Sequence, residues 1–290
     1  MFGRSIRLFT LLGFEVKVDA SWLIIAALIT WSLATGFFPY RFPGLPPAAY
    51  WWMGVLGAFG LFASIVFHEL CHAIVAKQYG LPMKGITLFI FGGVAEMVQE
   101  PQSPKIEFRM AIAGPISSLA LALGCYLVQG WGRVAGWPGP ATAVLYYLFL
   151  INALLAVFNM VPAFPLDGGR ILRSALWKWR ANLRWATRIA SGIGSGFGVF
   201  LIALGLFEVL RGNFIGGMWW FLIGMFLRGA SQASYRQLLL RRALEGEPVW
   251  RFMKPNPITV PLHISLRELV DEYFYRYHFK LFPVVGDGSE

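Results

Sequence analysis

The sequence predicts a membrane protein of the all-α class, with six transmembrane helices, a re-entrant or interfacial β-hairpin and a partial α/β segment at its C-terminal end. Hydrophobic residues make up 57% of the chain and charged residues 14%, whereas soluble domains carry about 25% charged residues. Apolar stretches long enough to cross a bilayer recur along the chain. Basic residues gather in alternate connections between these stretches, as the positive-inside rule describes.

The six spans are expected where the chain approaches the roughly 20 apolar residues that a bilayer requires. They cover roughly residues 20–38, 54–78, 108–129, 141–162, 190–210 and 213–229. The distribution of arginine and lysine predicts a multi-pass protein of the cell (plasma or inner) membrane with both ends in the cytoplasm. The net charge of +10 comes from residues between spans, not from a stripe on a soluble domain, so nucleic acid is excluded as a partner.

The hairpin is predicted between the second and third spans, in the segment KGITLFIFGGVAEMVQE at residues 84–100. Ile86–Phe91 is rich in β-branched and aromatic residues, Gly92 and Gly93 mark a turn, and Val94–Val98 follows as a second short run. Backbone groups at membrane depth need protein around them, which favours a re-entrant or interfacial position. A plain amphipathic loop is the alternative.

Two further regions are assigned a structural role and no functional site. Gly192, Gly194, Gly196 and Gly198 are spaced for close helix packing. Composition becomes polar after about residue 230, which divides the chain into a six-helix domain at 1–230, a linker at 231–248 and a small α/β segment at 249–290. In that segment we expect a strand at 258–260, a helix near 265–277 and a strand at 281–285.

The pattern that carries chemistry is His68-Glu69-Leu70-Cys71-His72 within the second span. Two histidines at i and i+4 share one face of a helix, so both imidazoles reach one Zn²⁺ while the intervening Glu69 is placed as general base. Ionisable groups are costly inside a membrane, which favours a functional role over a pair of buried histidines. Cys71 is interpreted as a small buried filler.

A catalytic zinc takes three protein ligands and leaves one position for water, so a third ligand is required. Asp167 is the candidate because it is the only acidic residue between Glu107 and Glu208, in a segment broken by prolines and glycines. An ordinary ion pair between Asp167 and Arg170 is the alternative. His263 and His278 lie in the tail and are disfavoured.

The expected chemistry is hydrolysis of a peptide bond, with one zinc per chain. The zinc would polarise the scissile carbonyl, and Glu69 would take a proton from water and pass it to the leaving amine. Asn159 is the candidate donor to the oxyanion, because it is a lone amide at the end of an apolar run. Asn152 is a weaker candidate, for which helix–helix hydrogen bonding is at least as good an explanation.

Together these segments resemble the site-2 protease family of intramembrane zinc metalloproteases. The resemblance rests on the H-E-L-C-H helix, the N-x-x-P-x-x-P-L-D-G segment at Asn159–Gly168, FGG at Phe91–Gly93 and AGP at Ala113–Pro115, and it covers roughly residues 1–230. It implies His68, His72 and Asp167 as zinc ligands, Glu69 as catalytic acid/base and Asn159 as support for the transition state. Family members often carry Asn where this chain has Ser118.

The resemblance also implies a task. Such enzymes act on membrane-tethered proteins in regulated intramembrane proteolysis, often an anti-sigma factor or a transcription factor precursor. The segment Phe91, Gly92, Gly93 and Val94 would bind the unwound substrate as an added strand.

The tail resembles the opening half of a CBS domain, at Met253-Lys-Pro, Thr259-Val-Pro, Ser265-Leu-Arg-Glu-Leu and Phe282-Pro-Val-Val. CBS modules commonly pair and bind adenine nucleotides, so a nucleotide cofactor and a homodimer are hypotheses for this tail.

Two other functions are considered for the whole chain. A zinc-binding transporter would spread its polar groups over several helices. A non-catalytic adaptor would need no Glu69.

Overall fold

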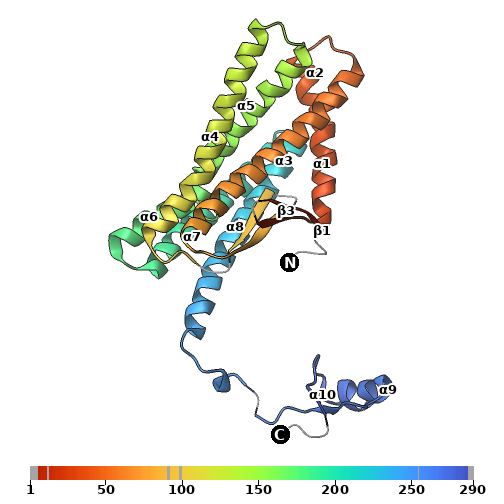
Figure 1. Cartoon of the computed structure of the whole chain (residues 1–290), viewed down its shortest axis with the longest axis vertical. Helices are drawn as coiled ribbons and strands as arrows, with labels where there is room; N and C mark the ends of the chain where they lie inside the picture. The colour runs from red at the N-terminus through yellow and green to blue at the C-terminus, as the bar shows by residue number, and fades with distance from the viewer. Residues whose placement is uncertain (1–5, 12, 90–91, 98–99, 254, 287–290) are drawn as a thin grey trace. The chain divides into compact units, whose positions relative to one another are not determined.

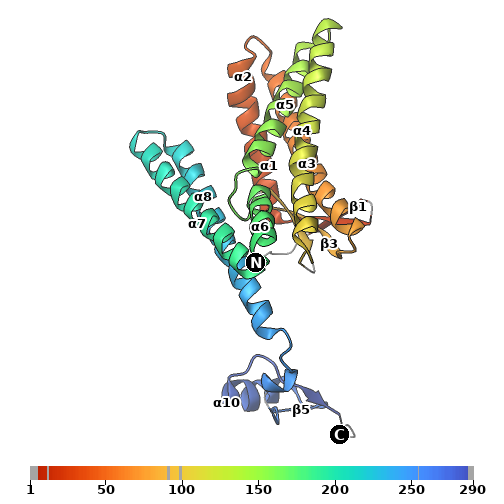
Figure 2. The same cartoon turned by 90° about the vertical axis from the view of Figure 1, so that its left-hand side faces the viewer.

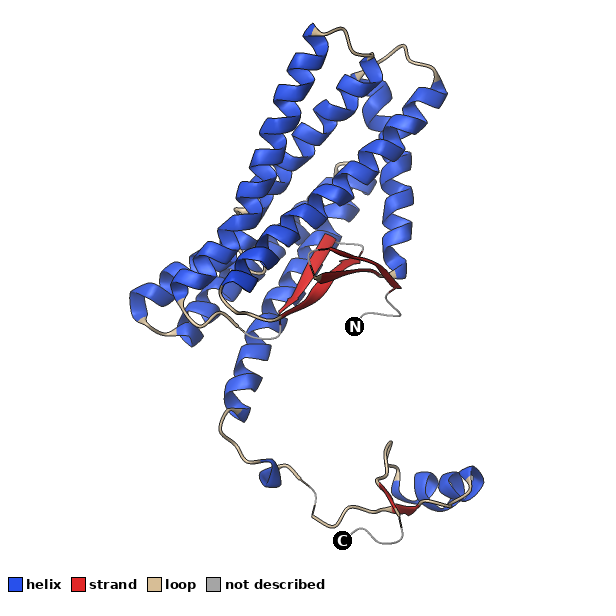
Figure 3. Ribbon diagram, viewed as in Figure 1, coloured by secondary structure: helices blue, strands red, loops and turns tan. Residues whose placement is uncertain are grey.

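The computed structural model describes residues 6–11, 13–89, 92–97, 100–253 and 255–286. Helices dominate this part of the chain (Figures 1 and 3). Six of the described helical stretches are long and apolar enough to cross a membrane, as the sequence predicts. These stretches are Ser21–Arg41, Pro47–Gln78, Pro104–Val134, Gly139–Asn159, Leu183–Leu210 and Phe214–Leu244.

The first span changes its winding part-way along. It runs from α1 (Ala20–Ser32) through a π-helical turn (Leu33–Phe37) into α2 (Phe38–Arg41). Asp19 caps its start, where the side chain accepts a hydrogen bond from the Ser21 backbone N–H. The remaining spans are α3 (Pro47–Gln78), α4 (Pro104–Val134), α5 (Gly139–Asn159), α7 (Leu183–Leu210) and α8 (Phe214–Leu244).

Helix α6 (Asp167–Arg180) is an element that the sequence analysis does not anticipate. The chain leaves α5 at Asn159 and passes two prolines, Pro162 and Pro165, before it becomes helical again. Helix α6 begins at Asp167 and ends before Ala181, which has a φ of 51°. The proline break therefore places the Asp167 carboxylate at the first residue of a helix.

A four-stranded sheet lies beside one end of α1 and α3 (Figures 1 and 3). Its order is β1-β2-β3-β4, with β2 parallel to β3 and the two outer pairs antiparallel. The two N-terminal strands, β1 and β2, are not predicted from the sequence. The strands are β1 (Ile6–Leu11), β2 (Phe14–Val18), β3 (Met83–Phe89) and β4 (Gly92–Met97).

The β3–β4 pairing covers the segment where the hairpin is predicted. Phe91 lies outside the described residues, and the depth of this segment in the membrane stays a prediction. Because β4 has a neighbour on one side only, it forms an edge of the described sheet.

The sheet is anchored on the helix that carries the two histidines. Phe14, Val16 and Val18 of β2 alternate with half-buried charged residues, and these three are buried. Phe14 packs against Leu70 and Ala73 of α3 in one apolar cluster. A strand with one buried face can only pair in one register, so this packing fixes the sheet beside the site.

Glycines form the seam between α7 and α8, which lie side by side (Figure 2). A Cβ at Gly198 would lie 2.7 Å from the Gly224 carbonyl oxygen, and one at Gly205 would lie 2.6 Å from that of Gly217. The helix packing predicted for the α7 glycines holds for Gly198, whereas Gly194 faces the Phe164 backbone, in the connection between α5 and α6, and Ser231 of α8. The prediction is wrong for Gly192 and Gly196, where a Cβ would meet nothing within 4 Å. Those two are on other faces of the helix.

A second compact unit follows, at Leu240–Glu290. Helix α8 continues to Leu244, so much of the segment expected as a linker is helical. Beyond it, a parallel pair joins β5 (Val260–Pro261) to β6 (Val284–Val285). Between them, a helical run comprises α9 (Leu266–Glu268), a π-helical turn (Leu269–Phe274) and α10 (Tyr275–Tyr277).

Candidate metal centre

Helix α3 presents His68 and His72 one turn apart on its buried face. Their side chains meet because residues four apart lie above one another on a helix. Both residues are less than 10% exposed, and their Nε2 atoms are 3.2 Å apart. The spacing in the sequence therefore produces a shared pair of nitrogen atoms inside the protein.

Asp167 completes a cluster of three. Its Oδ2 lies 3.0 Å from His68 Nε2 and 3.2 Å from His72 Nε2. Among the described residues, these three side chains form the one group whose ligand atoms gather closely enough to hold a metal ion. Burial raises the pKa of the Asp167 carboxyl, but its contacts with the His68 and His72 rings outweigh burial and hold that pKa well below its usual range. The carboxylate is therefore ionised, which is the form that binds metals.

Helix α4 sets the orientation of both imidazoles. His72 Nδ1 lies 2.7 Å from the Met110 carbonyl oxygen, and His68 Nδ1 lies 2.8 Å from Ser118 Oγ. A carbonyl oxygen only accepts, so His72 Nδ1 carries the proton of that bond, and the neutral ring then keeps its lone pair on Nε2. Hydrogen bonds of this kind fix metal-binding histidines in many proteins.

The cluster fits a zinc ion. Zinc bonds to nitrogen and oxygen are about 2.0–2.2 Å long, so tetrahedral ligand atoms lie about 3.3–3.6 Å apart. The three observed separations, 3.0 to 3.2 Å, are close to that spacing. Two imidazole nitrogens and a carboxylate are also a ligand set typical of catalytic zinc, which leaves a fourth position for water. Three acceptor atoms this close repel one another unless a proton or a metal ion lies between them.

Comparison with known proteins matches the chain that carries this cluster to a protein family. The sequence pattern of peptidase family M50 matches residues 56–136 and 132–204, which include all three cluster residues. A Synechocystis sp. protein, named as a candidate zinc metalloprotease, is 38% identical over 289 residues, covering 99% of this chain and 75% of the relative.

The chain belongs to peptidase family M50.

Two comparisons with Methanocaldococcus jannaschii agree with this M50 assignment. A zinc metalloprotease is 32% identical over 295 residues, covering 98% of this chain and 76% of the relative. The solved structure of a site-2 protease shares 31% identity and a TM-score of 0.54, covering 79% of this chain and 94% of that one. The M50 chain described here is a multi-pass membrane protein with the helical fold of that protease.

Glu69 follows His68 on α3, about 100° further around the helix. Its side chain is half-buried, and its carboxylate makes no hydrogen bond within the described part of the chain. Cys71 is half-buried and is not part of the metal cluster.

The two asparagines are placed differently from the cluster residues. Asn159, the last residue of α5, is half-buried and donates to the Leu155 carbonyl oxygen of its own helix at 3.0 Å. No contact brings it to the cluster among the described residues. Asn152 donates to Ser64 Oγ on α3 at 2.9 Å, which is the helix–helix hydrogen bond considered as its alternative role.

The segment expected to bind substrate is described in part. Gly92, Gly93 and Val94 lie in β4, opposite Phe89, Leu88 and Thr87 of β3. They belong to the edge strand of the described sheet. Phe91 is outside the described residues.

Sequence reasoning misses the polar partners of the histidines. Ser118 is fully buried and forms a hydrogen bond with His68 Nδ1. The Met110 partner is a backbone oxygen, so no side chain could have indicated it. The spacing of four between Met110, Gly114 and Ser118 on α4 was the available signal.

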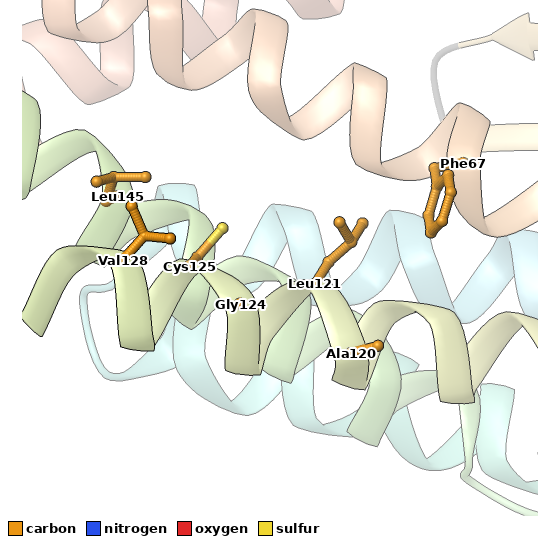
Figure 4. Close-up of a pocket in the computed structure, with 7 residues that line it drawn as sticks. All are labelled: Phe67, Ala120, Leu121, Gly124, Cys125, Val128 and Leu145. Atoms are coloured by element: carbon orange, nitrogen blue, oxygen red, sulfur yellow. The ribbon is translucent and has the colours of Figure 1, made fainter. Parts of the chain in front are cut away.

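An apolar hollow of about 330 Å³ lies between α3, α4 and α5 (Figure 4). The figure shows Phe67 above a row of α4 side chains, with Leu145 of α5 beyond them. The hollow contains no cluster residue, and Cys125 is its only sulfur. It has the lining of a lipid-facing surface and none of the groups that hydrolysis requires.

Proposed function

We propose that the chain is an intramembrane zinc metalloprotease of the site-2 protease type. It hydrolyses peptide bonds of membrane-tethered proteins within or next to the bilayer. One observation carries this proposal: two imidazoles on a membrane-spanning helix and a carboxylate some 95 residues away converge to within 3.2 Å. Peptidase family membership supports it independently.

The roles of the residues follow from their places. His68, His72 and Asp167 hold one zinc ion, which when bound supplies Lewis-acid polarisation of the scissile carbonyl and lowers the pKa of water. The Glu69 carboxylate accepts a proton from the attacking water and delivers it to the leaving nitrogen. Asn159 supports the oxyanion, a role that requires its amide to turn from Leu155 toward the substrate.

The substrate is proposed to enter as an extended strand beside β4. A helical peptide hides its carbonyl groups in its own hydrogen bonds, whereas an extended one exposes them. The edge position of Gly92, Gly93 and Val94 in the described sheet supports this arrangement. Phe91 extends the same predicted segment.

An apolar groove supports a membrane segment as the substrate. It has a volume of about 510 Å³ and lies between α1, α3 and the sheet. Phe62, Val66 and Leu70 of α3 line it, on the same helix as the histidines.

The proposed substrates are membrane-tethered proteins such as an anti-sigma factor or a transcription factor precursor, cleaved in regulated intramembrane proteolysis. The cell (plasma or inner) membrane with both ends cytoplasmic is the proposed location, on the basis of the basic connections.

For the C-terminal unit we propose a CBS-like role in adenine-nucleotide binding and in pairing with a second copy. The parallel pair β5–β6 with helical residues between them supports it. Exposed apolar side chains such as Leu262, Leu266 and Leu281 support a paired surface. Sedimentation of the full-length protein with and without ATP tests both parts.

The decisive experiment uses purified protein in proteoliposomes with a membrane-tethered substrate. Wild type should cleave it, a chelator should stop cleavage, and Glu69→Gln should abolish cleavage while it keeps one zinc per chain. Full activity of Glu69→Gln would overturn the mechanism. Zinc flux into vesicles without cleavage would favour a transporter, the alternative function. Zinc binding with neither flux nor cleavage would favour an adaptor.

A further inference from the structure

Gly114 lies against the two histidines at a distance that no side chain could tolerate. A Cβ at this position would be 2.2 Å from His72 Nε2 and 2.5 Å from His68 Nε2. Non-bonded carbon and nitrogen atoms do not approach that closely, since they are most stable about 3.5–4.0 Å apart. The volume next to both Nε2 atoms is therefore free because residue 114 has no side chain.

Residue 114 is the middle of a stripe on α4. Met110, Gly114 and Ser118 are four residues apart, so they share the face of the helix that meets α3. Met110 and Ser118 bind the Nδ1 atoms of His72 and His68. Gly114, between them, faces the opposite ring nitrogens. The outer members of the stripe orient the rings, and the central member leaves room beside them.

A left-handed backbone does not explain this glycine, because its φ is not positive. Gly114 is buried inside α4, directly before Pro115. Glycine in a helix interior costs about 1 kcal/mol relative to alanine, and the proline ring that follows also crowds a side chain at this position.

Close helix packing does not explain it either. Where glycine allows two helices to touch, the two atoms nearest to its missing Cβ are backbone atoms, as at Gly198. At Gly114 all three nearest atoms belong to imidazole rings. A methyl group here would push the rings aside rather than separate the helices.

We propose that Gly114 is a positioning residue that keeps the ion's coordination space open. The inference rests on the proposed function in that the ion is the catalytic zinc. It assigns a task to the central residue of the Ala113–Pro115 segment. Gly114→Ala should leave a folded protein that binds zinc at least tenfold more weakly, although every ligand is intact.

The test compares Gly114→Ala with Gly124→Ala on the same helix, where a Cβ would meet nothing within 4 Å. Full-length variants are stripped with a chelator, incubated with zinc, passed over a desalting column and measured for zinc by atomic emission. Wild type and Gly124→Ala should hold one zinc per chain, and Gly114→Ala should lose at least tenfold in affinity. Wild-type zinc affinity in Gly114→Ala would overturn the inference and leave the metal site standing. A wild type without zinc would instead overturn the site and the proposed function.

A folding defect is separated from the metal effect by a second comparison. His68→Ala with His72→Ala removes both rings that the added methyl group would meet. If Gly114→Ala unfolds, adding it to this pair should leave the melting temperature of the pair unchanged, because the clash has gone. A triple variant that stays unfolded would place the clash elsewhere and overturn the proposal.

Discussion

Helices meet by two different means in this protein. Around the metal centre they meet through polar groups: the histidines of α3 bind α4, and Arg173 of α6 pairs with the buried Glu107 of α4 at 2.5 Å. Between α7 and α8 they meet through glycine, with backbone against backbone. Lipid tails are as apolar as leucine, so neither contact gains from the hydrophobic effect.

The difference shows what each contact is suited for. A hydrogen bond has a direction, so the polar contacts hold ring planes and a carboxylate in one orientation. Glycine contacts bring helices together without constraining any side chain. The arrangement places directional contacts where ligand atoms must coincide within a few tenths of an ångström. It places non-directional ones where only proximity is needed.

The largest effect is expected from Arg173→Ala. Glu107 is fully buried, so removing its cation leaves an unpaired charge and should destabilise the protein by about 3–5 kcal/mol. Arg173→Met with Glu107→Leu should recover most of that loss, because the charge is gone. Denaturation in mixed micelles measures both. Equal stability of Arg173→Ala and wild type would mean that the α4–α6 contact is not electrostatic.

Next is Gly198→Leu in the glycine seam. Overpacking a close contact costs about 1–3 kcal/mol or more, and here the helices must move apart. The matched control is Gly196→Leu on the same helix, where a Cβ would meet nothing within 4 Å. The same denaturation assay should separate the two variants, with the control near wild type. Equal losses of stability in the two variants would contradict the close glycine contact between α7 and α8.

A smaller effect is expected from Ser118→Ala, which removes the partner of His68 Nδ1. Loss of the hydrogen bond to the other ring nitrogen of a metal-binding histidine lowers metal affinity by about 10–100-fold. Competition with a chelator measures it, and zinc content at saturation should be unchanged. Ser117→Ala is the control, because that hydroxyl donates only within its own helix, to the Gly114 carbonyl oxygen. If the two variants lose affinity equally, the hydrogen bond to His68 has no special role.

The smallest effect is expected at Asn152→Ala. Its bond to Ser64 joins α3 and α5, and single bonds of this kind contribute about 0.6 kcal/mol in membranes. Ser64→Ala and the double variant complete a mutant cycle. A coupling above about 2 kcal/mol would exceed the range known for such bonds and would place Asn152 among the residues that support the site.

The features that could be predicted from the sequence are those that follow from residue spacing, hydropathy or the scarcity of one residue type. Helical periodicity paired His68 with His72, and the scarcity of acidic residues indicated Asp167. The six spans followed from hydropathy. These signals are local or compositional, so no knowledge of neighbouring helices was needed.

What it did not predict depends on packing. Strand β2 alternates buried and charged residues, but it lies ahead of the first span and its partner β3 follows the second. The contacts of Ser118 and Gly114 with α3 require the rotation of one helix against another, which sequence spacing does not determine. Asn159 is a lone amide at the end of an apolar run, and this pattern does not reveal its hydrogen bond to Leu155 within α5.

The bond from His72 to the Met110 carbonyl has a consequence for genetics. Every amino acid at residue 110 supplies the same oxygen, so a saturation screen will not register this anchor however completely it samples the codons. Only chemistry on the main chain would reveal it. An ester linkage after residue 110, introduced by protein semisynthesis, would weaken that acceptor without altering any side chain around it.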